Sequence, residues 1–321
     1  MGEGESYMIL VTLKLSQNQK DRLRNALEMK DFVFVNRKDL KKEHLKNAEI
    51  IIGNIPIEML RECQNLKWIQ LSNAGADDIV RCKECRKEII ITNAKGAYGK
   101  VISEHMLAML FMLQKHMDKY LLHQQKQEWI SEMPPSLVEG KTMVIMGTGD
   151  IGGTFAKKVK ALGSYTIGVK RNPVDFLDNF DEIVTLSDLD SVIPRADILV
   201  MALPQTKYTS ALMNAERIER LKKTAIIINV GRGLAIDTDA LIIALKEKRI
   251  AGAALDVTEP EPLPRGHALW EMENVIITPH ISGNADVPET LEKILEIAEN
   301  NLKRYYSGEE LINIVDRSVG Y

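Results

Sequence analysis

Short apolar runs alternate with helix-like segments along almost the whole of this 321-residue chain. Runs this short, separated by helices, are typical of parallel sheets that are buried on both faces. The runs occupy residues 7–13, 32–35, 49–53 and 66–71 in a first series, and 142–147, 165–169, 182–185, 197–203, 225–230, 251–257 and 274–278 in a second. We therefore predict an α/β protein with two doubly wound parallel sheets.

The two series are separated by a long helical stretch, which we expect over residues 99–128. The segment "MPPSLVEGK" (133–141) then breaks the pattern with two prolines and a glycine. A helix is also expected at 18–29. A last one at 288–307 could pack on either domain. The length of the chain suits two domains of ordinary size.

The composition excludes several classes of protein. A net charge of −3, with 27% charged residues, lacks the basic surface of a nucleic-acid-binding protein. The longest apolar stretches, such as 106–113, are far too short to span a membrane. The start "MGEGESY" has no apolar segment of a secretory signal. Gly2 and Ser6 match the loose pattern for N-myristoylation, but a small flexible leader is the favoured interpretation. We expect a cytoplasmic protein that binds neither nucleic acid nor membranes.

Three cysteines are present, and two of them form "CKEC" (82–85). This spacing could supply half of a zinc site or a redox pair. A structural zinc site needs four ligands, however, and no second such pair follows. We therefore expect no metal, and interpret Cys82 and Cys85 as helix residues one turn apart near the surface.

A glycine motif follows the first strand of the second series. In "VIMGTGDIGG" (144–153) Gly147, Gly149 and Gly152 have the spacing G-x-G-x-x-G, directly after a strand and at the start of a helix. Gly147 would allow the tight turn, Gly149 the close approach of a pyrophosphate, and Gly152 the contact of helix and strand. The free N–H groups of the helix would meet the phosphates. The motif predicts dinucleotide binding.

The next strand ends in "VKRNP" (169–173), where an acid that binds the adenosine ribose is expected. Lys170 stands near that position. Lys170 and Arg171 would attract a 2′-phosphate, and arginine can hold a phosphate through two parallel hydrogen bonds. This favours NADP over NAD. The alternative is two solvated charges on a loop, with NAD held by backbone contacts.

Three polar side chains follow later strands: Arg232 in "INVGRG" (228–233), Glu261 in "ALDVTEPEPLP" (254–264) and His280 in "ITPHISG" (277–283). The carboxyl ends of parallel strands line the ligand crevice, so the three could meet beside a nicotinamide. Arg232 could hold a carboxylate and polarise a carbonyl. His280 could give and take a proton, and Glu261 could fix its tautomer. Each also has a purely structural interpretation: Arg232 could be a surface cap, Glu261 an exposed acid, and His280 a loop histidine whose hydrogen bonds are satisfied.

Together these segments resemble the D-isomer-specific 2-hydroxyacid dehydrogenase family. The resemblance covers nearly the whole chain and rests on "GTGDIGG", "LPQTKYT" (203–209), "INVGRG", "ALDVTEPEPLP" and "TPHISG", in the family's order. It implies Arg232, Glu261 and His280 as the catalytic set, with Glu261 selected over Glu259 because it lies five residues after the aspartate of "LDV". It also implies an NAD(P)-dependent oxidoreductase.

The resemblance further implies binding positions. Backbone N–H groups around Ala74 and Gly75, in "LSNAGADDI" (71–79), would bind the substrate carboxylate, and Asp256 would lie near the nicotinamide amide. Asn229 matches a position that lines the cofactor cleft. The expected substrate-binding residues are Asn73, Ala74, Gly75, Arg232 and His280. The expected cofactor-binding residues are Gly147, Thr148, Gly149, Asp150, Ile151, Gly152, Lys170, Arg171, Asn172, Leu203, Pro204, Thr209, Val230, Gly231, Arg232, Asp256, His280 and Gly283.

The same resemblance implies a domain arrangement. A flavodoxin-like substrate domain would comprise residues 1–97 and 287–321, and a Rossmann domain that binds NAD(P) would comprise residues 98–286. The helix that begins near Gly99 would be both a crossover and a homodimer contact. There are departures: Lys170 replaces the usual acid, and "SGNAD" (282–286) replaces a glycine-rich continuation.

These observations favour a reductase of small 2-oxo acids, with glyoxylate or hydroxypyruvate as the first choices. One alternative is a D-3-phosphoglycerate dehydrogenase, weakened because no added regulatory domain is visible. The other is a dinucleotide-sensing binding protein, such as a corepressor of the same fold. Such corepressors carry long extra tails, whereas this chain ends soon after "DRSVGY".

Overall fold

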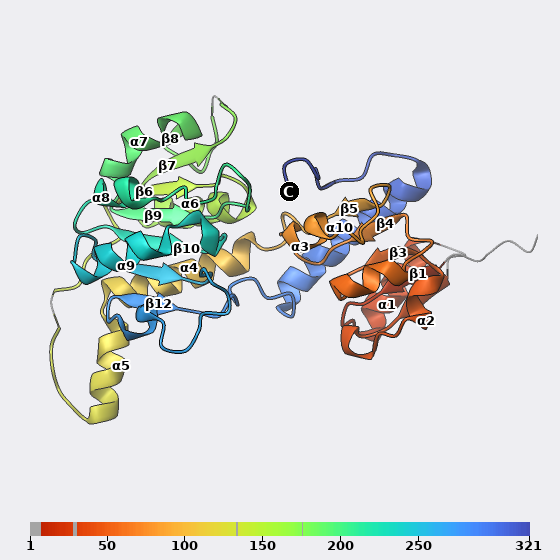
Figure 1. Ribbon diagram of the computed structural model, residues 1–321, viewed down its shortest axis with the longest axis horizontal. Helices are drawn as coiled ribbons and strands as arrows, with labels where there is room; N and C mark the ends of the chain where they lie inside the picture. The colour runs from red at the N-terminus through yellow and green to blue at the C-terminus, as the bar shows by residue number, and fades with distance from the viewer. Residues whose placement is uncertain (1–7, 28–30, 133, 175) are drawn as a thin grey trace, which may run out of the picture. The chain divides into compact units, whose positions relative to one another are not determined.

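The computed structural model describes residues 8–27, 31–132, 134–174 and 176–321 (Figure 1). The proposed leader at 1–7 lies outside them. The chain divides into two compact units, Met1–Ala97 with Ala285–Tyr321, and Tyr98–Asn284. We call them the five-stranded unit and the seven-stranded unit after their sheets. The second boundary falls two residues before the expected one, after Asn284 instead of after Asp286.

The five-stranded unit has one parallel sheet with the strand order β2-β1-β3-β4-β5. This is the flavodoxin-like order, in which the direction of sheet growth reverses between β1 and β3. Its strands are β1 (Met8–Val11), β2 (Asp31–Phe34), β3 (Ala48–Ile52), β4 (Trp68–Gln70) and β5 (Ile90–Thr92). Its helices are α1 (Gln17–Ala26), η1 (Arg37–Asp39), α2 (Glu43–Lys46), η2 (Ile57–Glu62), α3 (Asp77–Arg81) and α10 (Pro288–Ser307).

Both faces of this sheet are covered because most positions of its strands are apolar, and in β1 all four residues are. Ile9 and Val11 of β1 face a cluster that includes Leu23 of α1 and Leu295 of α10, whereas Leu10 belongs to the cluster on the opposite face. Successive side chains of a strand point to opposite faces, so an uninterrupted apolar run requires cover on both.

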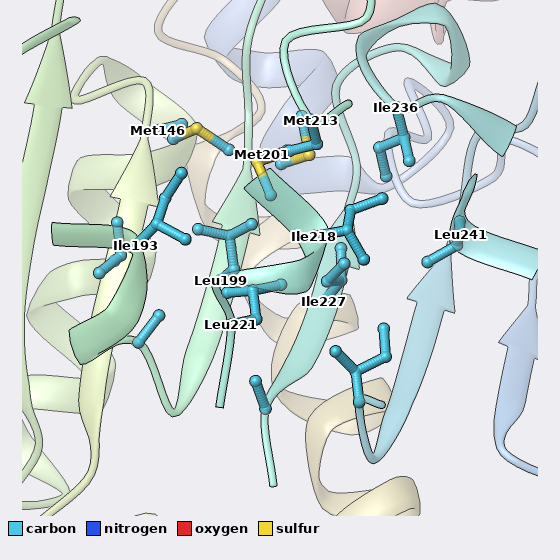
Figure 2. Packing of buried hydrophobic residues seen from close by; sticks show 14 of the residues in the cluster. Met146, Ile193, Leu199, Met201, Met213, Ile218, Leu221, Ile227, Ile236 and Leu241 are labelled. Atoms are coloured by element: carbon cyan, nitrogen blue, oxygen red, sulfur yellow. The ribbon is translucent and has the colours of Figure 1, made fainter. Parts of the chain in front are cut away.

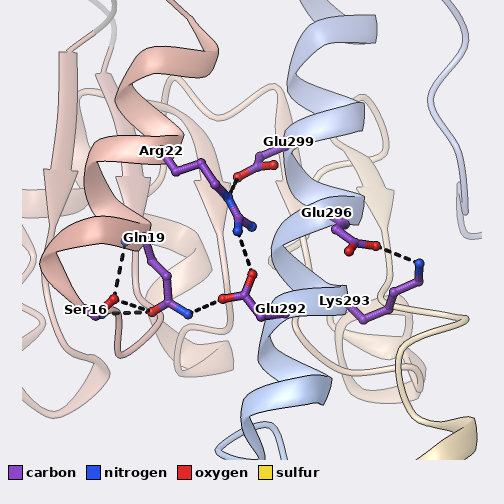
Figure 3. Close-up of polar contacts among 7 residues, drawn as sticks. All are labelled: Ser16, Gln19, Arg22, Glu292, Lys293, Glu296 and Glu299. Atoms are coloured by element: carbon purple, nitrogen blue, oxygen red, sulfur yellow. Dashed lines mark hydrogen bonds and ion pairs between the residues drawn. The ribbon is translucent and has the colours of Figure 1, made fainter.

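The C-terminal helix α10 is fixed to α1 by polar contacts as well (Figure 3). Arg22 donates to Glu292 at 2.6 Å and forms a second ion pair with Glu299. Gln19 donates to the other oxygen of Glu292 at 2.6 Å. The hydrogen bonds from Gln19 and Arg22 lower the pKa of Glu292. The ambiguity in the packing of this last helix is thus resolved in favour of the five-stranded unit.

The seven-stranded unit also has a wholly parallel sheet, with the order β12-β11-β10-β9-β6-β7-β8. Counted from β6, this is the doubly wound dinucleotide-binding order with one added strand, and growth reverses between β6 and β9. The strands are β6 (Thr142–Met146), β7 (Tyr165–Lys170), β8 (Glu182–Thr185), β9 (Ile198–Met201), β10 (Ile226–Asn229), β11 (Gly252–Leu255) and β12 (Val275–Ile277). The predicted fold class is confirmed.

The helices of this unit cover both faces of its sheet. They are α4 (Gly99–Gln114), α5 (Met117–Lys126), α6 (Asp150–Ala161), η3 (Leu186–Asp188), α7 (Leu189–Val192), η4 (Ile193–Arg195), α8 (Ala215–Glu219), η5 (Gly233–Ala235), α9 (Thr238–Lys246) and η6 (Ala268–Glu271). Figure 2 shows Met146, Leu199 and Ile227 of the sheet packed with Ile218 and Leu241 of α8 and α9. This core fixes the strand ends from which the site is built.

Three local expectations were wrong. The strand β5 was missed, because its three residues directly follow a turn. The long helix is interrupted: α4 ends at Gln114, and His116 has a left-handed backbone with φ of 54°. No glycine or proline marks this break. The "CKEC" segment lies on a turn after α3, with Cys85 buried, and not on a helix.

Candidate functional site

The glycine turn after β6 has the geometry that each glycine was expected to provide. Gly147 has φ of +98°, and a side chain there would meet the backbone oxygen of Ala202 at 2.5 Å. Gly152 lies so close to the turn that its Cβ would stand 1.9 Å from the oxygen of Gly147. A Cβ on Gly149 would meet nothing within 4 Å. The first and third glycines are therefore required by packing, whereas the second leaves open space.

A nicotinamide dinucleotide fits this turn. The turn stands at the reversal point of the sheet, because Gly147 follows β6 and Ala202 follows the neighbouring strand β9. Gly149 is the N-cap of α6, whose first N–H groups have no partner within the helix. Open space over Gly149, next to a helix N-terminus, suits a pyrophosphate. Thr148 and Ile151 occupy the intervening positions.

Asp150 has a contact that the sequence did not suggest. Its carboxylate accepts hydrogen bonds from the backbone N–H groups of Tyr98 at 3.1 Å and Gly99 at 2.7 Å. A Cβ on Gly99 would lie 2.3 Å from that carboxylate. The first turn of α6 is thereby tied to the start of α4, and the aspartate side chain serves the protein backbone.

Lys170 is the last residue of β7, where it is half-buried. Among the described residues it forms no ion pair, so its ammonium group remains available to an anion. Arg171 and Asn172 follow it and are exposed. The three residues stand at the carboxyl end of the strand next to β6, on the same sheet edge as the glycine turn.

The turn that carries Arg232 is built by its neighbours. The side chain of Asn229 accepts from the N–H of Gly231 at 3.0 Å and donates to the carbonyl of Arg232 at 2.9 Å. A Cβ on Gly231 would lie 2.6 Å from the oxygen of Leu203, and one on Gly233 would lie 2.0 Å from that of Thr258. The glycines on both sides of Arg232 thus let this turn pack between two neighbouring loops.

The loop after β9 closes on itself. Thr209 is buried, and its hydroxyl donates to the carbonyl of Pro204 at 2.7 Å and accepts from the N–H of Thr206 at 2.9 Å. The backbone of Leu203 packs against Gly231. Val230, on the other side of that contact, is buried.

His280 and Glu261 are joined directly. The distance between Nδ1 of His280 and Oε1 of Glu261 is 2.5 Å. A carboxylate only accepts hydrogen bonds, so Nδ1 carries the hydrogen and Nε2 is the nitrogen left for exchange. The side chains are 47% and 41% exposed, so the imidazole is accessible to a ligand. His280 has φ of 52°, in the left-handed region that histidine adopts only occasionally.

Asp256 holds the turn of residues 278–282, which we call the histidine turn. The carboxylate is buried and accepts from the hydroxyl of Thr278 at 2.6 Å and from the N–H groups of Ile281 at 2.9 Å and Ser282 at 3.1 Å. The N–H of His280 donates to the Asp256 carbonyl at 2.8 Å. Burial alone would raise the pKa of Asp256, but the hydrogen bonds from Ser282, Thr278 and Ile281 lower it overall.

A second histidine, His105, contacts the histidine turn through a hydrogen bond, and it was not predicted from the sequence. Nε2 of His105, on α4, lies 3.0 Å from the hydroxyl oxygen of Thr278. That hydroxyl donates its hydrogen to Asp256, so His105 is the donor to it. His105 stands in an apolar helix far from the turn in sequence, where no motif marks it. Gly283, the next residue after the turn, would place a Cβ 3.3 Å from atoms of Ile102 and Tyr98.

The register of the sheet brings the carboxyl ends of three strands to one level. Asn229 of β10 pairs with Leu255 of β11, which pairs with Ile277 of β12. Arg232 and His280 each follow the paired residue of their strand by three positions. Strands lie about 4.8 Å apart, so the exits of β10 and β12 are separated by about 10 Å.

The expected substrate residues Asn73, Ala74 and Gly75 belong to the five-stranded unit. Their loop is held by amides: Nδ2 of Asn54 donates to Oδ1 of Asn73 at 2.8 Å, and Nδ2 of Asn93 donates to the carbonyl of Ala74 at 2.8 Å. The catalytic candidates and this loop thus come from different units. Asn54 and Asn93 were missed, because single asparagines after strands are common in loops.

No cluster of three or more potential metal ligands occurs among the residues that the structure describes. In the same residues, no helix combines the length and the apolar character that crossing a membrane requires.

Fold and site together define a two-unit α/β protein with a dinucleotide turn and a histidine–carboxylate pair. A family model for the NAD-binding domain of D-isomer specific 2-hydroxyacid dehydrogenases matches residues 107–282. A glyoxylate reductase from Thermofilum pendens is 31% identical over 281 residues, which cover 84% of this chain and 80% of that protein.

Similar solved structures belong to the same family. A D-isomer specific 2-hydroxyacid dehydrogenase family protein from Aeromonas salmonicida has a TM-score of 0.86 and 30% identity, over 97% of this chain and 99% of that one. A D-isomer specific 2-hydroxyacid dehydrogenase from Xanthobacter autotrophicus, in complex with NADPH and MES, has a TM-score of 0.81 and 28% identity, over 98% and 100%. The chain belongs to the D-isomer specific 2-hydroxyacid dehydrogenase family and is therefore an oxidoreductase.

Proposed function

We propose that this protein reduces small 2-oxo acids to D-2-hydroxy acids with NADPH, and catalyses the reverse oxidation with NADP. Glyoxylate and hydroxypyruvate are the first candidates. The observation that carries the proposal is the hydrogen bond of 2.5 Å between His280 and Glu261, on the sheet edge that also bears the glycine turn and Arg232. A bound nicotinamide supplies the hydride, and residues of the chain supply the rest.

His280 is the proposed acid and base. Because Nδ1 is engaged by Glu261, Nε2 is the atom that donates a proton to the carbonyl oxygen in reduction and accepts it in oxidation. The Glu261 carboxylate fixes this tautomer and stabilises the imidazolium. Asp256 acts through the backbone: it holds the histidine turn and so positions the imidazole.

Arg232 is the proposed partner of the substrate. A guanidinium can bind the substrate carboxylate and at the same time polarise the carbonyl oxygen, on which negative charge develops during reduction. The backbone N–H groups around Ala74 and Gly75 would bind the same carboxylate.

The cofactor would lie over the glycine turn. The open space at Gly149 would receive the pyrophosphate. Lys170, which forms no ion pair among the described residues, would bind the 2′-phosphate and so favour NADP over NAD. Arg171 and Asn172 would add to this site. The backbones of Val230 and Gly231 and the loop of Leu203, Pro204 and Thr209 would line the cleft.

A turnover assay tests the proposal. Purified protein with NADPH and a panel of 2-oxo acids should consume the reduced nicotinamide, and the product should be the D isomer in a chiral analysis. Saturable NADPH binding without oxidation by any acid would contradict the proposal, and would support the alternative of a dinucleotide-sensing binding protein.

We also propose a cytoplasmic homodimer that contacts its partner through α5 and the segment after it. Large apolar side chains are exposed there, and Trp129 is fully so. Those of Met117, Leu121, Leu122, Trp129, Ile130 and Leu137 form the exposed set. Large apolar side chains exposed along one segment are typical of an interface. Leu121→Glu should convert the dimer to a monomer in sedimentation, whereas Ile243→Glu, at an exposed position of α9, should not. A wild-type monomer would refute the proposal.

A further inference from the structure

The five-stranded unit has a hollow of about 590 Å³ at the carboxyl ends of its strands. Thr12 follows β1 and Asn54 follows β3, and both line it. The hollow therefore stands where the strand order reverses, which is the place at which sheets of this topology bind ligands. All of its lining residues belong to the five-stranded unit.

The floor of the hollow is closely packed. Thr12 is only 6% exposed, and its hydroxyl donates to the carbonyl of Asn54 at 3.1 Å. A Cβ on Gly53 would lie 2.3 Å from that hydroxyl oxygen, so the strand ends cannot accommodate a larger residue without moving. Such a floor can hold a ligand in one orientation.

The wall of the hollow is cationic. Lys14, Arg37 and Lys38 line it, against one carboxylate, that of Asp286. Within the described part of the chain, none of the three cations forms an ion pair, although ion pairs are numerous elsewhere in this unit. Three cations around a concave surface raise the local concentration of anions, and an arginine can hold a carboxylate or phosphate with two hydrogen bonds.

The hollow is continuous with the loop proposed to bind the substrate carboxylate. Asn73 and Ser72 line it. The side chain of Asn54 donates to Asn73 at 2.8 Å and accepts from the N–H of Ser72 at 3.2 Å. A molecule whose carboxylate lies on the loop can therefore extend its other end into the hollow.

We propose that Lys14, Arg37 and Lys38 bind a second anionic group of the substrate, so that the preferred substrates are 2-oxo acids with a distal carboxylate or phosphate. The inference rests on the proposed function and narrows it. Glyoxylate has no carbon beyond its reacting carbon, so it could not reach into the hollow and would contact only the loop.

Paired substrates that differ in the distal charge test this proposal. 2-Oxoglutarate is compared with 2-oxoglutaramate, in which an amide replaces the distal carboxylate, and phosphohydroxypyruvate is compared with hydroxypyruvate. Wild-type protein is compared with Lys14→Ala/Arg37→Ala and with a control of equal charge, Lys46→Ala/Lys87→Ala, at exposed positions away from the hollow. In parallel, calorimetry measures the binding of glutarate and inorganic phosphate, which need no turnover.

We expect kcat/KM to be about 10- to 100-fold higher for the charged member of at least one pair, the range that a charge-assisted hydrogen bond gives. The double variant should lose this preference, and the control should keep it. Which pair responds distinguishes carboxylate from phosphate.

Turnover of both members at equal rates, unchanged in the double variant, would overturn the proposal and leave the proposed function intact. If no acid is turned over, the proposed function fails. Binding of glutarate or phosphate that the double variant loses would then still support an anion site, and binding unaffected by that variant would refute it.

Discussion

Two alanine substitutions in the glycine turn should have different effects: Gly152→Ala should lower thermal stability, and Gly149→Ala should weaken cofactor binding. Gly152→Ala would place a methyl group 1.9 Å from the oxygen of Gly147, whereas real Cβ contacts essentially never fall below 3.0 Å. Helix and strand would have to separate by at least 1.1 Å, the difference between these distances. Overpacking against a backbone atom costs about 1–3 kcal/mol, which lowers Tm by roughly 2–12 °C at about 2–4 °C per kcal/mol.

Gly149→Ala should change the stability little and should weaken the binding of NADPH. Nothing lies within 4 Å of the added methyl group, and the backbone at Gly149 is extended, with φ of −77°. The loss of glycine at a helix N-cap costs at most about 1 kcal/mol. The methyl would, however, occupy the space proposed for the pyrophosphate. Loss of one charge-assisted hydrogen bond should weaken NADPH binding about 10- to 100-fold.

Scanning calorimetry without ligand measures the Tm of both variants, and titration with NADPH measures their affinity for the cofactor. Each variant is the control for the other. A Gly149→Ala protein that binds NADPH like the wild type would refute the placement of the pyrophosphate. A Gly152→Ala protein of unchanged Tm would refute the packing argument.

Three further predictions concern single side chains. Asp256→Asn should lower Tm and kcat together, because at least one hydrogen bond worth about 1.5–3 kcal/mol to the histidine turn is lost; an unchanged kcat would exclude the positioning role. Lys170→Asp should raise the Kd of NADPH at least about 10-fold more than that of NADH, and equal effects would remove the basis for NADP preference. Hydrogen bonds that the His123 imidazole on α5 donates to Glu132 and Glu128 raise its pKa, so the protonated imidazole fixes the segment after α5. That contribution is full below the ordinary pKa of 6.5 and is lost as pH rises through the raised value. Sedimentation should therefore show a weaker dimer at higher pH, and a His123→Gln protein whose dimer has the same pH dependence would contradict this.

Much of the fold could be predicted from the sequence because parallel strands buried on both faces need uninterrupted apolar runs. The runs that became β6, β10 and β12 were located from this pattern, and α10 was predicted at its observed bounds. The break between α4 and α5 could not be predicted, since it depends on distant contacts. The N–H of Ser136 donates to the carbonyl of Gln114 at 3.1 Å and so ends the helix from outside.

The residues of the candidate site also fall into a group that could be predicted from the sequence and a group that could not. Residues that chemistry selects, such as His280 and Glu261, could be recognised in their motifs, and the structure brings them within hydrogen-bonding distance. Residues that act through the backbone could not. Asn229 was interpreted as lining a cleft, but its amide builds the turn of Arg232, and the support from His105 comes from another helix. Such roles depend on which loops meet in space.

In the proposed reaction His280 transfers a proton to the oxygen of a carbonyl that is reduced beside it. The most direct measurement compares kcat of His280→Ala with wild type, together with the Kd of NADPH for both proteins. We expect kcat to fall by about two to four orders of magnitude and the Kd of NADPH to stay essentially unchanged. A variant that turns over 2-oxo acids at the wild-type rate, or one that loses NADPH affinity while keeping its turnover, would contradict it.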